Sequence, residues 1–366
     1  MNKLIFLTPL LLLVMIGIAG ASGPTLPSGI QSYVPINLTN SQSSATPSPF
    51  QQMINLTESN AIYGSYIAYS GSLANFEYFY ANGTIIPAWI ESNSSGKLIT
   101  WANTIGIGAS SKLTIYLGFA SKTTNLLSSS GTSGIGEAPQ LSSTYAEYDD
   151  GAEVFPYYQR WGGLSALPSG WSSNNTNITY ASTYTSFYSS DGNSGNSGIY
   201  MPTTSAMQTF PLVFEYYGYQ YTTSGFGNEF QLSQTAITGG GSEGGYGFTS
   251  TGSSSTLYLS EYNNGGLVSM GISDSQTPSV YTFSVISSTS ESGMYNYQHL
   301  TTASPASSTP SYISFSDQNP STYPIVIYWL RTRAYPPSGV MPTTSAGSLV
   351  DPGINTTTSV EMVYEF

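Results

Sequence analysis

The chain contains no cysteine and few charged side chains. Charged residues make up 7% of its 366 residues, and there is a single histidine. Without cysteine, disulfide bonds, thiol catalysis and zinc fingers are excluded, so each domain must be stable through packing alone. Only seven residues are basic and the formal net charge is −12. This balance argues against nucleic-acid partners and against docking on anionic lipid headgroups, which both require a basic surface.

Tyrosine, threonine, serine, asparagine and glycine dominate what is present. Thirty tyrosines and short apolar alternations broken by Gly, Ser and Pro favour strands over helices. Strand candidates are residues 33–39, 50–56, 73–80, 84–90, 97–101, 112–119, 212–221, 226–232, 256–262, 280–286, 312–315, 323–334 and 360–366. In 112–119, Leu113, Ile115 and Leu117 alternate with polar residues or tyrosine, and Asn82-Gly83 is a hairpin signal. We predict an all-β protein of two β-sandwich domains.

The N-terminal 22 residues have the pattern of a secretory signal peptide. Lys3 precedes an apolar run over residues 4–20, which ends in Ala19-Gly20-Ala21. An uncleaved membrane anchor is the alternative, because the run is long enough to span a bilayer. Either interpretation places the body of the protein outside the cytoplasm, with this segment as its sole membrane contact.

The remaining chain divides into two domains of unequal size. Residues 23–32 form a tether, 33–126 a small β-sandwich, 127–144 a Ser/Gly-rich linker, and 145–366 a larger jelly roll. Before the linker every basic residue is Lys, and after it every one is Arg. The hexapeptide Met-Pro-Thr-Thr-Ser-Ala occurs at 201–206 and again at 341–346, which we interpret as coincidence or a small local duplication.

Seven Asn-x-Ser/Thr sequons are candidate glycosylation sites in an exported protein. They are Asn37, Asn55, Asn82, Asn93, Asn174, Asn177 and Asn355.

The densest acidic cluster is residues 147–153. It resembles the Glu-x-Asp-x-x-Glu strand motif of jelly-roll glucanases, but Ala152 replaces the last acid. On a regular strand Asp149 and Glu153 would lie roughly 13 Å apart at about 3.3 Å per residue, too far for a retaining or an inverting pair of acids. Asp149 and Asp150 are candidate calcium ligands, and a turn with solvated or capped carboxylates is the alternative. No other cofactor is indicated.

Arg331 and Arg333 lie at strand spacing, so their guanidinium groups project from one face. They pair either with carboxylates of their own acidic domain or with a ligand. Trp161 and Trp171 flank Gly/Pro/Ser loops, where a flat ring stacks on a sugar or covers a sheet edge. These four residues are our ligand-binding candidates.

Three other tryptophans lie in alternating strand patterns and are predicted to be in the core. They are Trp89, Trp101 and Trp329.

The segments 82–92 and 114–119 resemble an extracellular domain of unknown function common in archaeal surface proteins. In that family the domain often precedes a concanavalin-like lectin/glucanase domain, whose start resembles 148–151 and whose last strands resemble 329–342. The resemblance covers nearly the whole chain after the signal. It implies a concanavalin-like jelly roll as the second domain and carries over no catalytic or ligand residue.

These patterns together indicate a secreted or cell-surface, non-enzymatic protein whose lectin-like domain binds glycan or another envelope component. Two alternatives stay open. The domains serve as subunits of an adhesin or envelope, assembling with further copies through Tyr- and Thr-rich faces, or the protein is a glycoside hydrolase.

Overall fold

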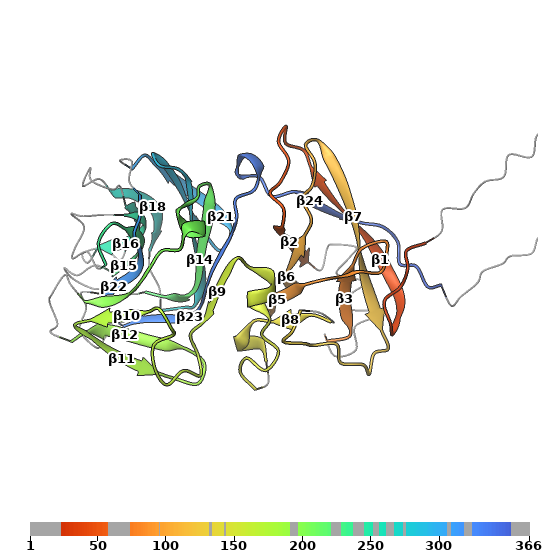
Figure 1. Cartoon of the computed structure of the whole chain (residues 1–366), viewed down its shortest axis with the longest axis horizontal. Helices are drawn as coiled ribbons and strands as arrows, with labels where there is room; N and C mark the ends of the chain where they lie inside the picture. The colour runs from red at the N-terminus through yellow and green to blue at the C-terminus, as the bar shows by residue number, and fades with distance from the viewer. Residues whose placement is uncertain are drawn as a thin grey trace, which may run out of the picture.

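The computed structural model describes residues 23–57, 74–94, 96–131, 134–142, 144–190, 197–220, 228–236, 245–251, 256–260, 267–273, 276–305, 309–317 and 324–352. In these residues the chain forms two β-sandwiches that lie beside each other (Figure 1). The predicted fold class is confirmed in its architecture: the protein is all-β, with two sandwich domains. The described helical segments are short: η1 (Pro139–Leu141), α2 (Gly151–Val154), η2 (Ser205–Gln208) and η3 (Pro337–Gly339).

The first sandwich packs a five-stranded sheet on a four-stranded sheet. The five-stranded sheet has the order β24-β1-β7-β3-β4. Its strands are β1 (Ile30–Asn40), β3 (Phe76–Phe79), β4 (Ile85–Ile86), β7 (Ser111–Ala120) and β24 (Thr343–Ala346). The four-stranded sheet has the order β2-β6-β5-β8. Its strands are β2 (Phe50–Thr57), β5 (Ala88–Ser94), β6 (Lys97–Thr104) and β8 (Gly136–Glu137).

The core of this sandwich follows the predicted alternation. Ile115 and Leu117 of β7 form one buried cluster with Ile54 and Leu98 of the facing sheet. The turn at Asn82-Gly83 joins β3 to β4, with Gly83 at φ 83° in the left-handed region that a hairpin turn of this kind requires.

The second sandwich packs a seven-stranded sheet on an eight-stranded sheet. The seven-stranded sheet has the order β10-β13-β22-β15-β16-β17-β18. Its strands are β10 (Ser172–Asn174), β13 (Gly198–Pro202), β15 (Asn228–Ser233), β16 (Tyr246–Thr251), β17 (Thr256–Ser260), β18 (Leu267–Ser273) and β22 (Tyr312–Asp317). The eight-stranded sheet has the order β11-β12-β23-β14-β19-β20-β21, with β9 beside β23. Its strands are β9 (Tyr157–Arg160), β11 (Thr176–Tyr180), β12 (Thr185–Ser189), β14 (Leu212–Tyr219), β19 (Ser279–Ser287), β20 (Ser290–Tyr295), β21 (Gln298–Ala303) and β23 (Ile325–Ala334).

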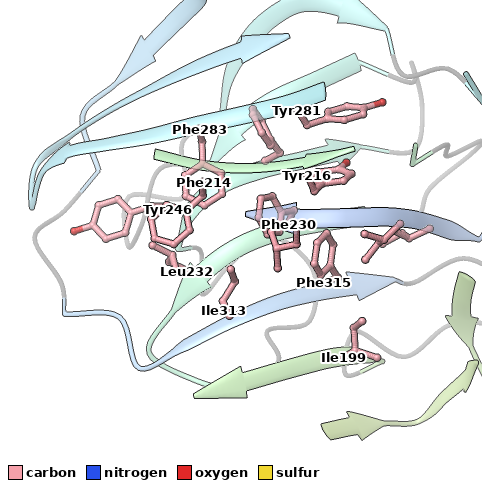
Figure 2. Packing of buried hydrophobic residues seen from close by; sticks show 14 of the residues in the cluster. Ile199, Phe214, Tyr216, Phe230, Leu232, Tyr246, Tyr281, Phe283, Ile313 and Phe315 are labelled. Carbon is pink, nitrogen blue, oxygen red and sulfur yellow. The ribbon is translucent and has the colours of Figure 1, made fainter. Parts of the chain in front are cut away.

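Aromatic cross-strand pairs fill the space between these two sheets (Figure 2). Tyr216 lies opposite Tyr281 with ring centroids 4.7 Å apart and nearly parallel planes. Phe230 lies opposite Phe315 at 4.4 Å. Pairs of this kind stabilise a sheet by about 0.2–1 kcal/mol each beyond alanine pairs, so they add to the stability that the buried core gives this domain without disulfides.

A third apolar cluster joins the two sandwiches. It combines the outward face of the four-stranded sheet, the segment around α2 and the outward face of the eight-stranded sheet. Its buried members are Trp89, Ile99, Trp101, Ala138, Val154, Phe155, Val280 and Trp329. The core prediction for three tryptophans is therefore confirmed, although they lie between the domains rather than inside one of them.

The boundaries between the domains differ from those predicted. The stretch predicted as a linker, 127–144, contributes β8, which pairs in parallel with β5. The flanking residues Ile135 and Ala138 are buried. The end of the predicted jelly roll, 145–366, also returns to the first sandwich, where β24 pairs with β1. The chain thus crosses between the sandwiches twice.

The acidic stretch 147–153 is not a strand. Residues 145–148 form a turn and α2 follows directly. Gly151 lies against the ring of Tyr158, where an added Cβ would lie 2.6 Å from the ring, so the chain turns tightly here. The segment therefore forms a turn, as in the second of the two interpretations, and not the regular strand on which the separation of Asp149 and Glu153 was calculated.

Candidate functional site

The outward face of the eight-stranded sheet lies toward the first sandwich. Because side chains alternate along a strand, Val213, Glu215 and Tyr217 of β14 share this face. Their cross-strand partners on β19 are Ser284, Thr282 and Val280. Those on β23 are Arg333, Arg331 and Trp329. One cavity lies near each end of this row of residues. A buried network of ion pairs occupies the positions between the two cavities.

The ion network joins the two domains. Nη2 of Arg331 lies 2.7 Å from Oε2 of Glu91, in the first sandwich, and its Nε lies 2.7 Å from Oε2 of Glu215. Nη2 of Arg333 lies 2.9 Å from Oε1 of Glu215. Burial alone would raise the pKa of the Glu215 carboxyl, but the guanidinium groups of Arg333 and Arg331 hold it below its ordinary value. Of the two sequence interpretations, the structure shows carboxylate pairing for both arginines, and both are buried.

Aromatic rings surround the Arg331 guanidinium. Its Cζ lies 4.5 Å from the ring centroids of Trp101, Phe155 and Trp329, and 5.3 Å from that of Trp89. A desolvated guanidinium over several rings is stabilised by the ring quadrupoles. This arrangement fixes the position of Glu91, because Arg331 binds it within the same cluster.

The larger of the two cavities has a volume of about 520 Å³ and lies beside Glu91. Its wall contains amide, hydroxyl, carboxylate, ammonium and phenol groups as well as apolar atoms. It is lined by Glu91, Ser92, Asn93, Ser94, Lys97, Ile99, Gln140, Leu141, Tyr217, Pro278, Val280, Asn296 and Tyr297. We call this the polar cavity.

Glu91 is held in one orientation at the edge of the polar cavity. Its Oε2 accepts hydrogen bonds from Nε1 of Trp101 at 2.7 Å, from Nη2 of Arg331 and from the hydroxyl of Tyr297. Its Oε1 accepts none within the described part of the chain. Burial and the neighbouring Glu91 charge raise the pKa of Tyr297 well above its ordinary value, so this phenol is a hydrogen-bond donor. The site thus presents a fixed carboxylate oxygen beside a tyrosine ring.

The smaller cavity has a volume of about 190 Å³ and lies on the other side of Tyr297, which lines both cavities. Methionine, valine, aromatic and proline side chains make up most of its wall. It is lined by Met53, Trp101, Val213, Ser284, Met294, Tyr297, His299, Arg333, Tyr335, Pro336, Gly339 and Met341. We call this the apolar cavity.

Trp161 and Trp171 lie in the core of the second sandwich. They are 0% and 7% exposed, and their rings pack edge to face with centroids 4.8 Å apart. Nε1 of Trp171 donates to the hydroxyl of Tyr157. Their neighbouring Gly/Pro/Ser loops suggested exposure, but both rings are packed inside, so neither presents a face to a sugar.

Asp149 and Asp150 do not form an open oxygen site. Oδ1 of Asp149 accepts from Nε1 of Trp89 at 3.0 Å and Oδ2 from the hydroxyl of Tyr158 at 2.9 Å. Asp150 is 2% exposed, and burial together with the charge of Asp149 raises its pKa to about 8. Among the described residues there is no group of three His, Cys, Asp or Glu side chains that could hold a metal ion. These contacts agree with the alternative to calcium binding, a turn whose carboxylates are capped by hydrogen bonds.

The sequons differ in exposure. Asn82, Asn174 and Asn177 are exposed, Asn37, Asn55 and Asn93 are partly buried, and Asn355 lies outside the described residues. Asn93 lines the polar cavity. The N-terminal apolar run also lies outside the described residues, and within them no helix combines the length and apolar character that crossing a membrane takes.

Sequence reasoning missed Glu91, Glu215 and Tyr297. The available signal was an acid inside a strand of large apolar residues, as at Glu215 between Phe214 and Tyr216. In a chain with so few charges, such an acid needs a buried cation. Glu91 could not be found in this way because its partner lies in the other domain.

Sequence comparison with known proteins identifies one partial relative. No family model matches the sequence. Uncharacterized protein 562 of Sulfolobus islandicus rod-shaped virus 1 is 38% identical over 128 residues, which cover 34% of this chain and 21% of that protein. The match therefore spans about a fifth of the relative's length. The matched relative is a protein of an archaeal virus, whereas the sequence segments resembled domains of archaeal surface proteins.

Similar solved structures cover about half of this chain. The Emp47p carbohydrate recognition domain has a TM-score of 0.35 at 15% identity, covering 49% of this chain and 95% of that domain. The metal-free Emp46p carbohydrate recognition domain has a TM-score of 0.33 at 11% identity, covering 48% and 94%. The Bacillus licheniformis β-glucanase has a TM-score of 0.29 at 13% identity, covering 48% and 97%. Similarity at this level identifies no ligand for this chain.

Proposed function

We propose that this protein is a non-enzymatic extracellular binding protein that recognises a glycan in the polar cavity between its two sandwiches. The observation that carries the proposal is the lining of that cavity, where hydrogen-bond donors and acceptors stand beside a tyrosine ring. A sugar presents hydroxyl groups that both donate and accept, together with an apolar ring face. Amides, a carboxylate and a phenol ring complement these features.

Preorganisation also supports binding of a neutral, hydroxylated ligand. Glu91 lines the cavity and is fixed by three donors on Oε2, while its Oε1 accepts no hydrogen bond within the described residues. A fixed acceptor loses little entropy when a ligand hydroxyl donates to it. The low content of ionic side chains is consistent with a binding surface that recognises the hydroxyl groups of a ligand rather than charged groups.

Screening of the protein on a glycan array, followed by calorimetry with the best oligosaccharide, tests the proposal. The protein should be made in a host without N-glycosylation, because a glycan on Asn93 would enter the cavity that the ligand needs. We expect saturable binding, and Asn93→Ala and Lys97→Ala should each weaken it about tenfold. Lys112→Ala, at an exposed lysine of β7 that does not line the cavity, should leave it unchanged. Absence of saturable binding to any glycan contradicts the proposal.

A further inference from the structure

Three methionines and the single histidine of the chain line the apolar cavity. They are Met53, Met294, Met341 and His299. The three methionines are partly buried and the histidine is exposed. The other methionines of the described residues are buried in the core of the second sandwich, and they are Met201, Met207 and Met270. The thioethers outside the sandwich cores therefore gather around one small cavity, together with an imidazole that solvent reaches.

Strand register places these side chains in two facing pairs. Met294 of β20 lies opposite His299 of β21. Met294 also lies opposite Thr282, so this pair is on the face of the eight-stranded sheet that lies toward the first sandwich. Met53 of β2 lies opposite Trp101 of β6, on the outward face of the four-stranded sheet. Directly opposed residues have Cβ atoms about 4.5–5.5 Å apart, so each sheet brings one close pair to the cavity.

Met341 joins these pairs from the segment that returns to the first sandwich. It lies between η3 and β24. The carbonyl of the next residue, Pro342, accepts a hydrogen bond of 3.1 Å from Nε2 of Gln52, the neighbour of Met53. The backbone beside Met341 is therefore attached to the backbone beside Met53, and three separate parts of the chain supply thioethers to one cavity.

The donor set of the cavity is soft. Thioether sulfur and imidazole nitrogen together suit Cu(I). Calcium and magnesium take oxygen ligands, and no carboxylate of the described part of the chain lines this cavity. Zinc sites use thiolates, imidazoles and carboxylates, of which the wall offers a single imidazole.

The charge balance at the cavity favours a monovalent ion. Arg333, which also lines it, is paired with Glu215, and Arg331 is paired with Glu91 and Glu215. The two guanidinium groups are thus matched by two carboxylates, and neutral ligands leave the charge of a metal ion uncompensated. Desolvating one positive charge here costs less than desolvating two.

We infer that the apolar cavity is a Cu(I) site, with the sulfur atoms of Met53, Met294 and Met341 and the imidazole of His299 as ligands. The exposed imidazole gives the ion a route from solvent. The inference is independent of the proposed function, which concerns the polar cavity.

Anaerobic titration of the full chain with Cu(I), in competition with the chelator bicinchoninate, tests the inference. We expect about one ion to bind per chain. Met294→Leu and His299→Gln should each weaken binding about tenfold or more, because each removes a ligand. Met207→Leu, in the core of the second sandwich, is the matched control and should leave the affinity unchanged. Leucine is close to methionine in volume, so these exchanges perturb packing little.

Methionine methyl spectra of the wild type give a second test that does not depend on a variant's stability. Ag(I), a soft monovalent ion that is not oxidised or reduced here, should shift the three methyl resonances that Met→Leu exchange assigns to Met53, Met294 and Met341. The resonances of the core methionines should stay in place. Absence of Cu(I) binding, an affinity that survives both Met294→Leu and His299→Gln, or Ag(I) shifts confined to other methionines overturns the inference.

Discussion

Asp150 is a buried acid in the segment that connects the two sandwiches. Its carboxyl packs on Gly136, where an added Cβ would lie 1.7 Å from Oδ1, so this glycine makes room for the acid. Burial and the charge of Asp149 raise its pKa to about 8. Burial and the charge of Glu147 also raise the pKa of Glu137, to about 7. The segment therefore contains acids that favour the protonated state.

The free energy of unfolding should depend on pH through Asp150. Because its folded-state pKa exceeds the value of about 4 in unfolded chains, its contribution is full below pH 4 and is lost as pH rises through about 8. Asp150→Asn should therefore flatten the decline between pH 5 and pH 8.5 in denaturant titrations. Glu153→Gln, an exposed neighbour whose charge contributes less to the raised pKa of Asp150, should flatten the decline less than Asp150→Asn does. Identical slopes in wild type and Asp150→Asn would contradict this assignment.

Individual side chains were predictable where one strand decides their environment. The alternation around Trp89, Trp101 and Trp329 correctly indicated burial. The loops around Trp161 and Trp171 suggested exposure, but packing between sheets distant in sequence buries both rings. Sequence pattern shows that a ring is amphipathic, whereas tertiary contacts decide which side of it meets water.

At the scale of elements, long strands with clear alternation were predicted well, whereas several strands of two to seven residues were missed. Strands β1, β2, β7, β19 and β23 fall within about two or three residues of their predicted ranges. Strand β8 has two residues and β24 four, and neither has enough alternation to stand out. The predicted strand at 360–366 lies outside the described residues. Short strands form because a partner edge is available, which a local pattern does not report.

The repeated hexapeptide illustrates this point. In 201–206 the first two residues end β13 and the last two begin η2. In 341–346 the last four residues form β24. The same six letters adopt two structures because the second copy lies beside the open edge of β1. Interpreting the repeat as coincidence or local duplication, rather than as a repeat architecture, agrees with these different surroundings.

Removing β24 should weaken the first sandwich at one edge. The chain beyond it also pairs with β1, since Tyr33 and Val350 exchange backbone hydrogen bonds of 3.0 and 2.8 Å. Truncation after Val340 should raise amide hydrogen exchange in the β1 residues that face this edge by tenfold or more. Peptides from the β3–β7 pair serve as the internal control and should exchange at the wild-type rate. Unchanged exchange in β1 would show that the edge is stable alone.

At the scale of the whole molecule, the contact between the sandwiches resembles a core more than a surface contact. It contains the buried cluster of tryptophans and the Arg331 network. The candidate site also exists only at this scale, because each cavity takes residues from both sandwiches. Sequence analysis predicted the two domains but contained no information about which faces meet. The site could therefore not be predicted, although its function class was proposed from composition and fold.

Arg331→Met should uncouple the unfolding of the two domains. The change leaves Glu91 and Glu215 buried without one of their cations, which typically costs about 3–5 kcal/mol. We expect the wild type to unfold in a single calorimetric transition and the variant to show two. Arg160→Met is the matched control, because Arg160 forms no ion pair within the described residues, and it should cost less than about 1 kcal/mol. A single transition in Arg331→Met with wild-type stability would contradict a shared interface core.

The return of β24 to the first sandwich has a consequence for biosynthesis. Domains usually fold in order as the ribosome delivers them, with the N-terminal one first. Here β1 precedes the second sandwich in the chain, and its partner β24 is translated only after that sandwich. The edge of β1 in the newly made first sandwich therefore stays unpaired on this side until β24 is translated. A chaperone that shields strand edges would protect it from pairing with other chains during that time.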